Sequence, residues 1–246
     1  MASALLSVNV NKYALLRNSR GHDTPNLLWA CDEVLAAGAH GVTVHPRRDQ
    51  RHVRLDDVPT VAAHLATAHP GVELNVECEA HPDLIDLVLE VRPAQCTLVP
   101  VRPGEVTSDH GYAFPDDAAA LRPVIERLRA AGIRVAAFVD CDPIAAAGAA
   151  AAGLDRVELY TGPYAWAWGK PEHEVERAKV FAAAAAAVGA GLAVNAGHDL
   201  DRHNLAGLRG LPGLAEVSIG HAQICRALEV GTRQSVGELL AALGHR

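Results

Sequence analysis

A short basic segment has the clearest chemical character in this sequence. It begins at His45, carries Arg47, Arg48 and Arg51, and ends at His52. Arginine presents a fork of donors that matches phosphate oxygens, so the segment could bind a phosphorylated small molecule. The alternative is a solvated charged loop. The segment directly follows a β-branched run, and this position favours phosphate binding if the run ends at an active face.

A carboxylate, Glu77, ends the next apolar run, Leu74–Val76. A carboxylate at the end of an otherwise apolar strand is costly unless it is used or paired. Glu77 could be a structural ion-pair partner, or a general base whose pKa is tuned by burial. Spacing alone favours neither.

Two Gly-His turns occur late in the chain, at His198 in Asn195–His198 and at His221 in Ser218–His221. Glycine lets the backbone approach an anion closely. In barrel enzymes the loops after the last two strands often hold a phosphate. One such histidine would ordinarily be structural, but two in the same position on successive runs favour a function.

Other residues give weaker signals. No histidine pair has HxH or HxxxH spacing, and nothing in the sequence demands a metal ion. His64, His69 and His173 have the pattern of surface helix or loop residues. Asp140 and Asp142 are expected to be structural or to support the site. No glycine-rich nucleotide loop is present.

These residues must be positioned by a repeating pattern of short β-branched runs, most of them followed by an alanine- or leucine-rich helical stretch. The runs are Leu6–Asn11, Gly41–His45, Glu73–Glu77, Gln95–Pro100, Arg134–Asp140, Arg156–Gly162, Leu192–His198 and Glu216–His221. Eight β/α units close a sheet into a barrel, and barrel enzymes keep their chemistry at the carboxyl ends of the strands. The length of 246 residues is close to the ~250 typical of that fold. We therefore expect one (β/α)8 TIM-barrel domain spanning Met1–Arg246.

The connections have recognisable patterns. The first run is expected to lead into a polar loop through Arg17, Arg20 and Gly21, and a helix starting near Pro25 follows. The longest loop, about Val101–Pro115, has no apolar period, and loops of this length are often lids.

Composition restricts the class of protein. The net charge of −7 argues against a nucleic-acid surface, which needs an excess of Lys and Arg. Five widely spaced cysteines without a CxxC pair indicate reduced thiols, and the amino terminus lacks the pattern of a signal peptide. We expect a cytoplasmic protein that binds neither nucleic acid nor a membrane.

Four segments together resemble the pyridoxine 5′-phosphate synthase family. They are Val8–Gly21 (VNVNKYALLRNSRG), Gly41–His52 (GVTVHPRRDQRH), Asn195–His198 and Ile219–His221. The second segment is highly specific, and the resemblance covers the whole chain in order and spacing.

The resemblance implies a barrel with extra helices that assembles into octamers and needs no metal or organic cofactor. It implies that 1-deoxy-D-xylulose 5-phosphate and 3-amino-2-oxopropyl phosphate condense to pyridoxine 5′-phosphate, phosphate and water. The implied proton acceptors are His45 and Glu77, and the implied proton donor is His198. The implied ligands of the aminoketone phosphate are Asn9, Arg20, Gly220 and His221, and those of the pentulose phosphate are Arg47, His52 and Thr107. Asn11, Lys12 and Asp199 are also expected to bind substrate.

The chain departs from the family pattern at several positions. Asn11 and Lys12 stand where many members have Asp-His, Asp199 stands where many have Gly, and Val101 replaces an acidic residue. These differences leave two alternatives open. One is a divergent barrel enzyme that condenses or isomerises phosphosugars with a different partner. The other is a barrel that binds a phosphorylated vitamin without catalysis, although a binding protein has no need of several buried proton-transfer groups.

Overall fold

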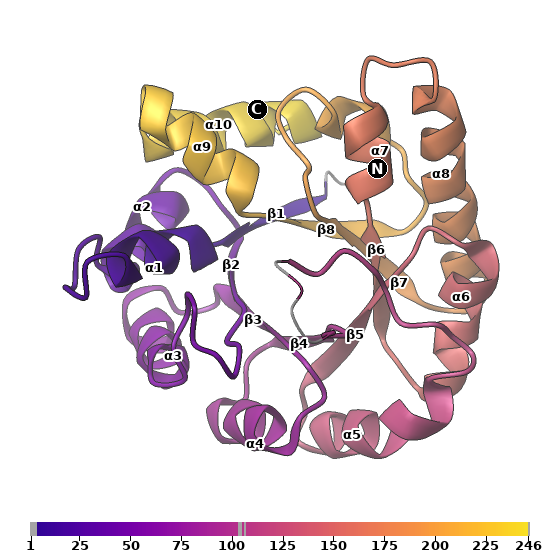
Figure 1. Ribbon diagram of the computed structural model, residues 1–246, viewed down its shortest axis with the longest axis horizontal. Helices are drawn as coiled ribbons and strands as arrows, with labels where there is room; N and C mark the ends of the chain where they lie inside the picture. The colour runs from indigo at the N-terminus through magenta and orange to yellow at the C-terminus, as the bar shows by residue number, and fades with distance from the viewer. Residues whose placement is uncertain (1–3, 103–104, 106, 246) are drawn as a thin grey trace.

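Eight parallel strands form a closed barrel in the computed structural model, which describes residues 4–102, 105 and 107–245. The strands are β1 Leu5–Asn9, β2 Gly41–Val44, β3 Glu73–Cys78, β4 Gln95–Leu98, β5 Arg134–Val139, β6 Arg156–Tyr160, β7 Ala193–Gly197 and β8 Leu214–Ile219. Each pairs with the next, and β8 returns to β1 (Figure 1). The predicted TIM barrel is confirmed, with every strand within two residues of its expected bounds.

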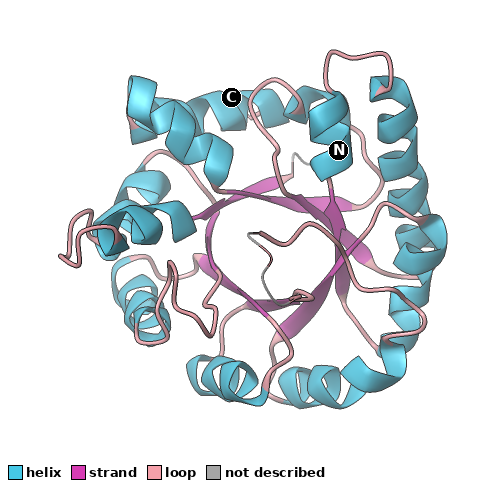
Figure 2. Cartoon of the chain, viewed as in Figure 1, coloured by secondary structure: helices cyan, strands magenta, loops and turns pink. Residues whose placement is uncertain are grey.

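Helices surround the barrel, as Figure 2 shows. Within the described residues they are α1 Asn11–Asn18, α2 Leu27–Ala36, α3 Asp57–Ala68, α4 Pro82–Val91, α5 Ala118–Ala130, α6 Pro143–Gly148, α7 Gly162–Ala167, α8 His173–Gly189, α9 His221–Val230 and α10 Thr232–Leu243, with 3₁₀ turns at Ala149–Ala152 and Leu205–Leu208. All of the described helices are too short or too polar to cross a membrane.

The first connection differs from its sequence-based prediction. Helix α1 occupies Asn11–Asn18, where a polar loop was expected. The prediction was wrong because it took polar residues as a sign of an exposed loop, whereas Asn11 and Arg17 of this helix are buried. Arg17 is buried and forms a bidentate ion pair with Asp57 at the start of α3, with both distances at 2.7 Å. Asn18 donates to the backbone carbonyl of His52 at 2.7 Å, so α1 holds the end of the basic segment.

Alternation along the strands separates two environments. Leu6 and Val8 of β1 are fully buried in the main core with residues of the surrounding helices. Ser7 lies between them on the opposite face, because successive side chains of a strand alternate. Its hydroxyl is 2.6 Å from the hydroxyl of Thr43 on β2, and Thr97 donates to Asn75 in the same layer at 3.1 Å. The barrel interior is therefore hydrogen-bonded rather than filled with aliphatic side chains.

A buried carboxyl group also lies in this interior, on β8. Burial raises the pKa of Glu216 to about 7, although the charge of Arg156 opposes the shift. Asn195 links the two residues, because it donates to Glu216 at 3.5 Å and accepts from Arg156 at 3.2 Å. The folded protein therefore holds a proton on Glu216 that an unfolded chain releases at a lower pH.

This raised pKa predicts a pH-dependent stability difference for Glu216→Gln. The stabilising effect of the bound proton is fully present below the unfolded pKa, near 4.5, and is lost as the pH rises through about 7. The loss is on the order of 3 kcal/mol, since each pKa unit corresponds to ~1.4 kcal/mol. Glutamine cannot ionise, so the variant gains on the wild type across this window. Urea unfolding at pH 5 to 8, with exposed Glu90→Gln as control, measures the gain; a difference independent of pH would contradict it.

Candidate active site

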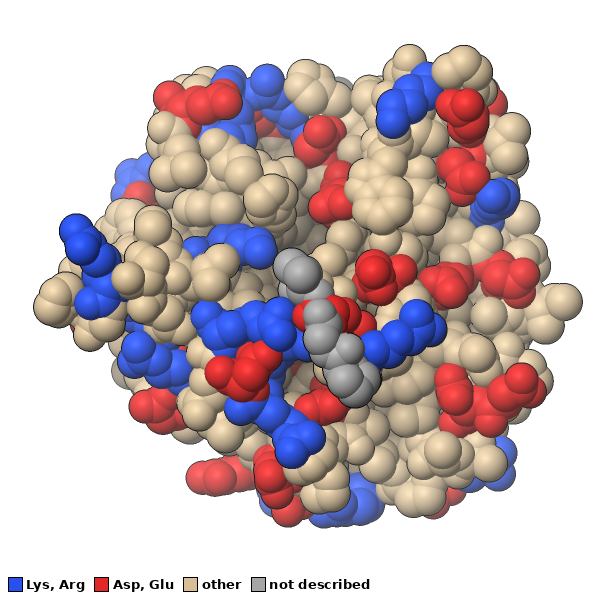
Figure 3. All heavy atoms as spheres, in the orientation of Figure 1, with Lys and Arg blue, Asp and Glu red and all other residues tan. Residues whose placement is uncertain are grey.

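A cavity of about 540 Å³ opens at the carboxyl ends of the strands. Figure 3 shows Lys and Arg side chains gathered beside the hollow at the centre of this face. The cavity brings together every site residue predicted from the sequence except one: His45, Glu77, His198, Asn9, Asn11, Lys12, Arg47, His52, Thr107, Asp199, Gly220 and His221. The exception is Arg20, whose side chain is exposed after α1 and does not line the cavity.

A buried histidine–carboxylate pair forms one wall of the cavity. His45 Nδ1 lies 3.3 Å from Glu77 Oε2, and both side chains are about nine-tenths buried. Glu77 also accepts hydrogen bonds from Asn9 and Ser218, each at 3.3 Å. His45 Nε2 is buried and has no hydrogen-bond partner among the described residues. A carboxylate on one imidazole nitrogen orients the ring and leaves the other nitrogen to exchange a proton with a ligand.

The two asparagines beside this pair position it through the backbone. Asn9 Oδ1 accepts the N–H of Asn11 at 3.0 Å. Asn11 Oδ1 in turn accepts the N–H of His45 at 2.9 Å. The ends of β1 and β2 are thereby tied together, and His45 is fixed at its backbone as well as at its ring.

His52 also lines the cavity, and its hydrogen bonding fixes the tautomer of its ring. Its Nδ1 accepts the N–H of Val53 at 2.9 Å, so the neutral ring carries its proton on Nε2 and can donate it to a ligand. Burial, followed by the charges of His45, Arg47 and Lys12, lowers the pKa of His52 to about 3. His52 is therefore a neutral donor throughout the physiological range.

The basic side of the cavity contains Arg47 and Lys12. Arg47 is buried, and its Nη1 lies 3.7 Å from Oε1 of Glu105 in the long loop. That separation is too long for a hydrogen bond. The guanidinium thus keeps donors for an anionic ligand, as expected of an arginine in a phosphate site.

The amino terminus of α9 lies at the cavity as well. Gly220 precedes this ten-residue helix, and His221 is its first residue. A Cβ at Gly220 would lie 2.8 Å from the carbonyl oxygen of Asn9, so only glycine fits. Helix amino termini attract anions through their free N–H groups and the helix dipole.

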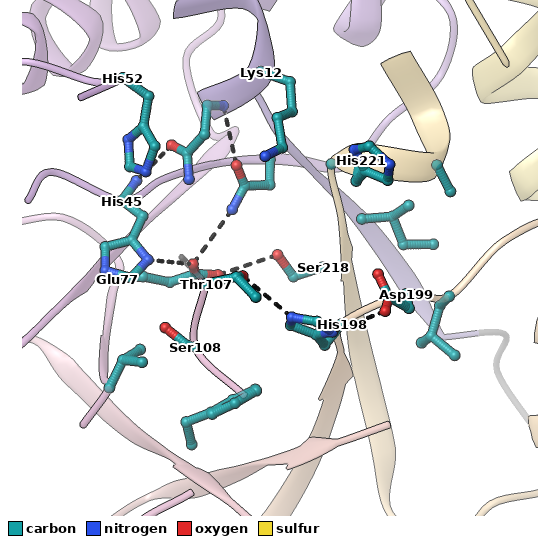
Figure 4. Close-up of a pocket in the computed structure, with 18 of the residues that line it drawn as sticks. Lys12, His45, His52, Glu77, Thr107, Ser108, His198, Asp199, Ser218 and His221 are labelled. Atoms are coloured by element: carbon teal, nitrogen blue, oxygen red, sulfur yellow. Dashed lines mark hydrogen bonds and ion pairs between the residues drawn. The ribbon is translucent and has the colours of Figure 1, made fainter. Parts of the chain in front are cut away.

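His198 faces the histidine–carboxylate pair from β7 (Figure 4). Its Nε2 lies 3.3 Å from the hydroxyl of Thr107 in the long loop, and its Nδ1 lies 3.3 Å from Asp199 Oδ2. Trp166 donates its indole N–H to the same carboxylate oxygen at 2.7 Å. His198 and Asp199 both have positive φ, +81° and +57°, a strained backbone that is typical of functional turns.

Glu158 is a cavity residue that the sequence analysis missed. It lies on β6, and a Cβ on Gly197 of β7 would come within 2.2 Å of its Oε1, so the glycine makes room for the carboxyl group. Burial, with Glu77 and Glu216 nearby, raises its pKa well above the ordinary value. Its Oε2 has no hydrogen-bond partner among the described residues. The signal was present, since a glutamate stands between valine and leucine in an otherwise apolar strand.

A protein-family model described as pyridoxal phosphate biosynthesis protein PdxJ matches residues 6–245. The chain belongs to this family. A pyridoxine 5′-phosphate synthase of Albidiferax ferrireducens is 48% identical over 244 residues, covering 97% of this chain and 96% of the relative. One of Mesorhizobium japonicum is 46% identical, covering 98% and 99% respectively.

Solved structures share the fold at much lower identity. A native KDPGal structure has a TM-score of 0.63 and 15% identity, covering 98% of this chain and 95% of the other. Phosphoribosyl anthranilate isomerase from Thermus thermophilus has a TM-score of 0.59 and 14% identity, covering 97% and 98%. At these identities the likeness shows the barrel and nothing of the chemistry.

The neutral state of His52 can be observed directly. We expect its ring nitrogens to show the Nε2–H tautomer at neutral pH and to remain unprotonated down to about pH 3, because burial and neighbouring positive charges oppose protonation. Long-range ¹H–¹⁵N NMR spectra of the unliganded protein, assigned with His52→Gln, report both properties. A ring that titrates between pH 6 and 7 would be incompatible with this site geometry.

Proposed function

We propose that this PdxJ-family protein is a pyridoxine 5′-phosphate synthase in vitamin B6 biosynthesis. It condenses 1-deoxy-D-xylulose 5-phosphate with 3-amino-2-oxopropyl phosphate to pyridoxine 5′-phosphate, phosphate and water. The observation that carries this proposal is the pairing of two kinds of site in one cavity. Proton-transfer groups lie on opposite walls, at His45–Glu77 and His198, and anion-binding groups lie beside each wall. A chain 48% identical over nearly its full length has the name of this activity.

The proposed proton acceptors are His45 and Glu77. Amine–ketone condensation, phosphate elimination, water loss and ring closure all require proton movement at carbon, nitrogen and oxygen. The unpartnered Nε2 of His45 points to a base that Glu77 orients and supports. We propose His198 as the proton donor, with Asp199 orienting its ring through the contact at Nδ1. The raised pKa of Glu158 keeps that carboxyl group protonated, so it can donate a hydrogen bond to a developing oxyanion.

The two phosphates have separate proposed sites. Arg47, His52 and Thr107 would hold the pentulose phosphate, while Gly220 and His221 at the start of α9 would hold the aminoketone phosphate with Asn9, Asn11 and Lys12 close by. Arg20 stays a proposed ligand of the aminoketone phosphate, although its exposed position requires the segment after α1 to move toward the cavity. A cavity of about 540 Å³ lies within the ~300–1,000 Å³ range of ligand sites.

The long loop is proposed to act as a lid. Residues 103, 104 and 106 of this loop lie outside the described residues, but Thr107 contacts His198 and so lies at the proposed proton donor. A closed lid protects reactive intermediates from water. The family resemblance further supports a single domain over Met1–Arg246, a homo-octamer, a cytoplasmic location and catalysis without a metal or organic cofactor.

The activity can be tested with both substrates. Purified protein mixed with 1-deoxy-D-xylulose 5-phosphate and freshly generated 3-amino-2-oxopropyl phosphate should form pyridoxine 5′-phosphate, detected by mass spectrometry, with or without chelator. His45→Ala should lower the rate by roughly 10²–10⁴-fold, the usual contribution of an acid–base group. His203→Ala, an exposed histidine outside the cavity, is the control and should be unaffected.

If no pyridoxine 5′-phosphate forms, binding and turnover with other partners distinguish the two alternative functions. Binding of either phosphate without product, but turnover with another phosphorylated partner, would favour the divergent barrel enzyme. Binding without turnover of any partner would favour the non-catalytic carrier. In the first case, the substitutions Asn11→Asp, Lys12→His and Asp199→Gly restore the common family residues and should recover activity with the aminoketone.

Asp199 offers a separate test of the proposed proton donor. Asp199→Asn keeps the shape of the side chain but removes the charge beside His198, so kcat should fall by roughly tenfold, part of the ~10²–10⁴ that a general acid contributes. KM should change little, because Asp199 contacts the imidazole at Nδ1 and acts through the orientation of the ring. Asp116→Asn, an exposed aspartate, is the matched control. A raised KM with an unchanged kcat would assign Asp199 to substrate binding alone.

A further inference from the structure

Outside the cavity, an aspartate and two histidines converge between α2 and α3. His64 Nε2 lies 2.6 Å from Asp32 Oδ1, and His69 Nε2 lies 2.7 Å from the same oxygen. Asp32 belongs to α2, His64 lies in α3, and His69 directly follows α3. Because α3 ends where the chain turns into β3, this cluster lies toward the amino-terminal ends of the strands. That end of the barrel is opposite the proposed active site.

The local backbone explains how two histidines five positions apart meet one carboxylate. His64 is within the helix, whereas His69 caps it with φ −134° and ψ 58°, outside the helical region. This turn brings the second ring back toward α2, and the two ring centroids are 5.8 Å apart. Two imidazole nitrogens and one carboxylate oxygen therefore lie within 4.8 Å of one another.

We propose that Asp32, His64 and His69 bind a divalent transition-metal ion, zinc in preference, with water completing the coordination. Zinc takes histidine nitrogen at about 2.0–2.1 Å and carboxylate oxygen at about 2.0–2.2 Å, in tetrahedral geometry. Tetrahedral ligands at those distances are about 3.3 Å apart. The present nitrogen–oxygen separations of 2.6 and 2.7 Å need to widen by less than about 1 Å, which side-chain rotation can supply.

Accessibility and ligand type also suit a metal. The exposed fractions of the His64 and His69 side chains are 23% and 26%, and that of Asp32 is 46%, so an ion can enter from solvent. Asp32 supplies a carboxylate oxygen and the two histidines supply ring nitrogens, which are ligand types that zinc takes in proteins.

The site would be structural rather than catalytic. It would link α2 to α3, two neighbouring outer helices, and it contains no residue of the cavity. Among the described residues one other group has comparable spacing: Glu105, Asp109 and His110 in the loop over the cavity. Zinc bound there or at the cavity histidines must be distinguished from zinc bound at the helix pair, and this requirement shapes the experiment.

The test compares the zinc bound by three forms of the full-length protein after removal of metal by chelator. The forms are the wild type, His64→Gln combined with His69→Gln, and a control in which exposed His22 and His203 both become glutamine. Each is titrated with Zn²⁺ against a chromophoric chelator. We expect the wild type and the control to bind one more equivalent than the first variant. Their Tm should rise with zinc, and that of the variant should rise less.

A conservative variant controls for the possibility that the histidine substitutions disturb the fold. Asp32→Asn retains a hydrogen-bonding side chain but loses the ligand charge, so its Tm without metal should stay close to that of the wild type. Its affinity for this zinc should fall by more than the roughly 10–100-fold that loss of an outer-shell partner costs. Equal zinc stoichiometry and equal zinc-dependent Tm in all forms would overturn the proposal and leave the cluster as hydrogen-bonded surface residues.

Discussion

The burial of three carboxyl groups inside one closed sheet is the constraint on which this structure depends. Glu77, Glu158 and Glu216 come from β3, β6 and β8 and are all at least nine-tenths buried. An unpaired charge in such a place is strongly unfavourable, so each group must be paired, hydrogen-bonded or protonated. Closure of the barrel brings partners from neighbouring and more distant strands into the interior, and this is why the interior is polar where an ordinary core would be aliphatic.

The three buried carboxyl groups have different surroundings. These differences distinguish the groups that can take part in catalysis from the one that affects stability. Glu77 has His45, Asn9 and Ser218 around it, an environment in which a carboxylate can exchange protons with a neighbouring base. Glu158 has room beside Gly197 and keeps a proton. Glu216 lies with Arg156 and Asn195, away from the cavity lining. We therefore expect acid–base function at the carboxyl ends of the strands, where a bound ligand can supply the hydrogen-bond partners that buried polar atoms lack.

The strands were predictable because their signals are local and periodic. β-branched runs of suitable length, followed by polar turns, mark parallel strands, and eight of them imply closure. Glu77 and the Gly-His turns were found because polar residues at strand ends stand out. Helix α1 was missed because burial of Arg17 depends on Asp57, forty residues later, and no local pattern reveals that pair. The positions of Arg20 and of the partners of Asp32 likewise depend on tertiary contacts.

The departures from the family pattern make sense when charge and hydrogen bonding are considered together. Asn11 accepts the N–H of His45 through its side-chain oxygen, a task that an aspartate could perform equally well, so the geometry at β2 does not require a charge. Exchanging Asp-His for Asn11 and Lys12 removes a negative charge and adds a permanent positive one beside the cavity. Asp199 places one negative charge on the opposite wall, where the family resemblance leads us to expect glycine. This charge contacts His198 and is anchored by Trp166, so it offsets the added positive charge only in part and does so beside the proposed proton donor.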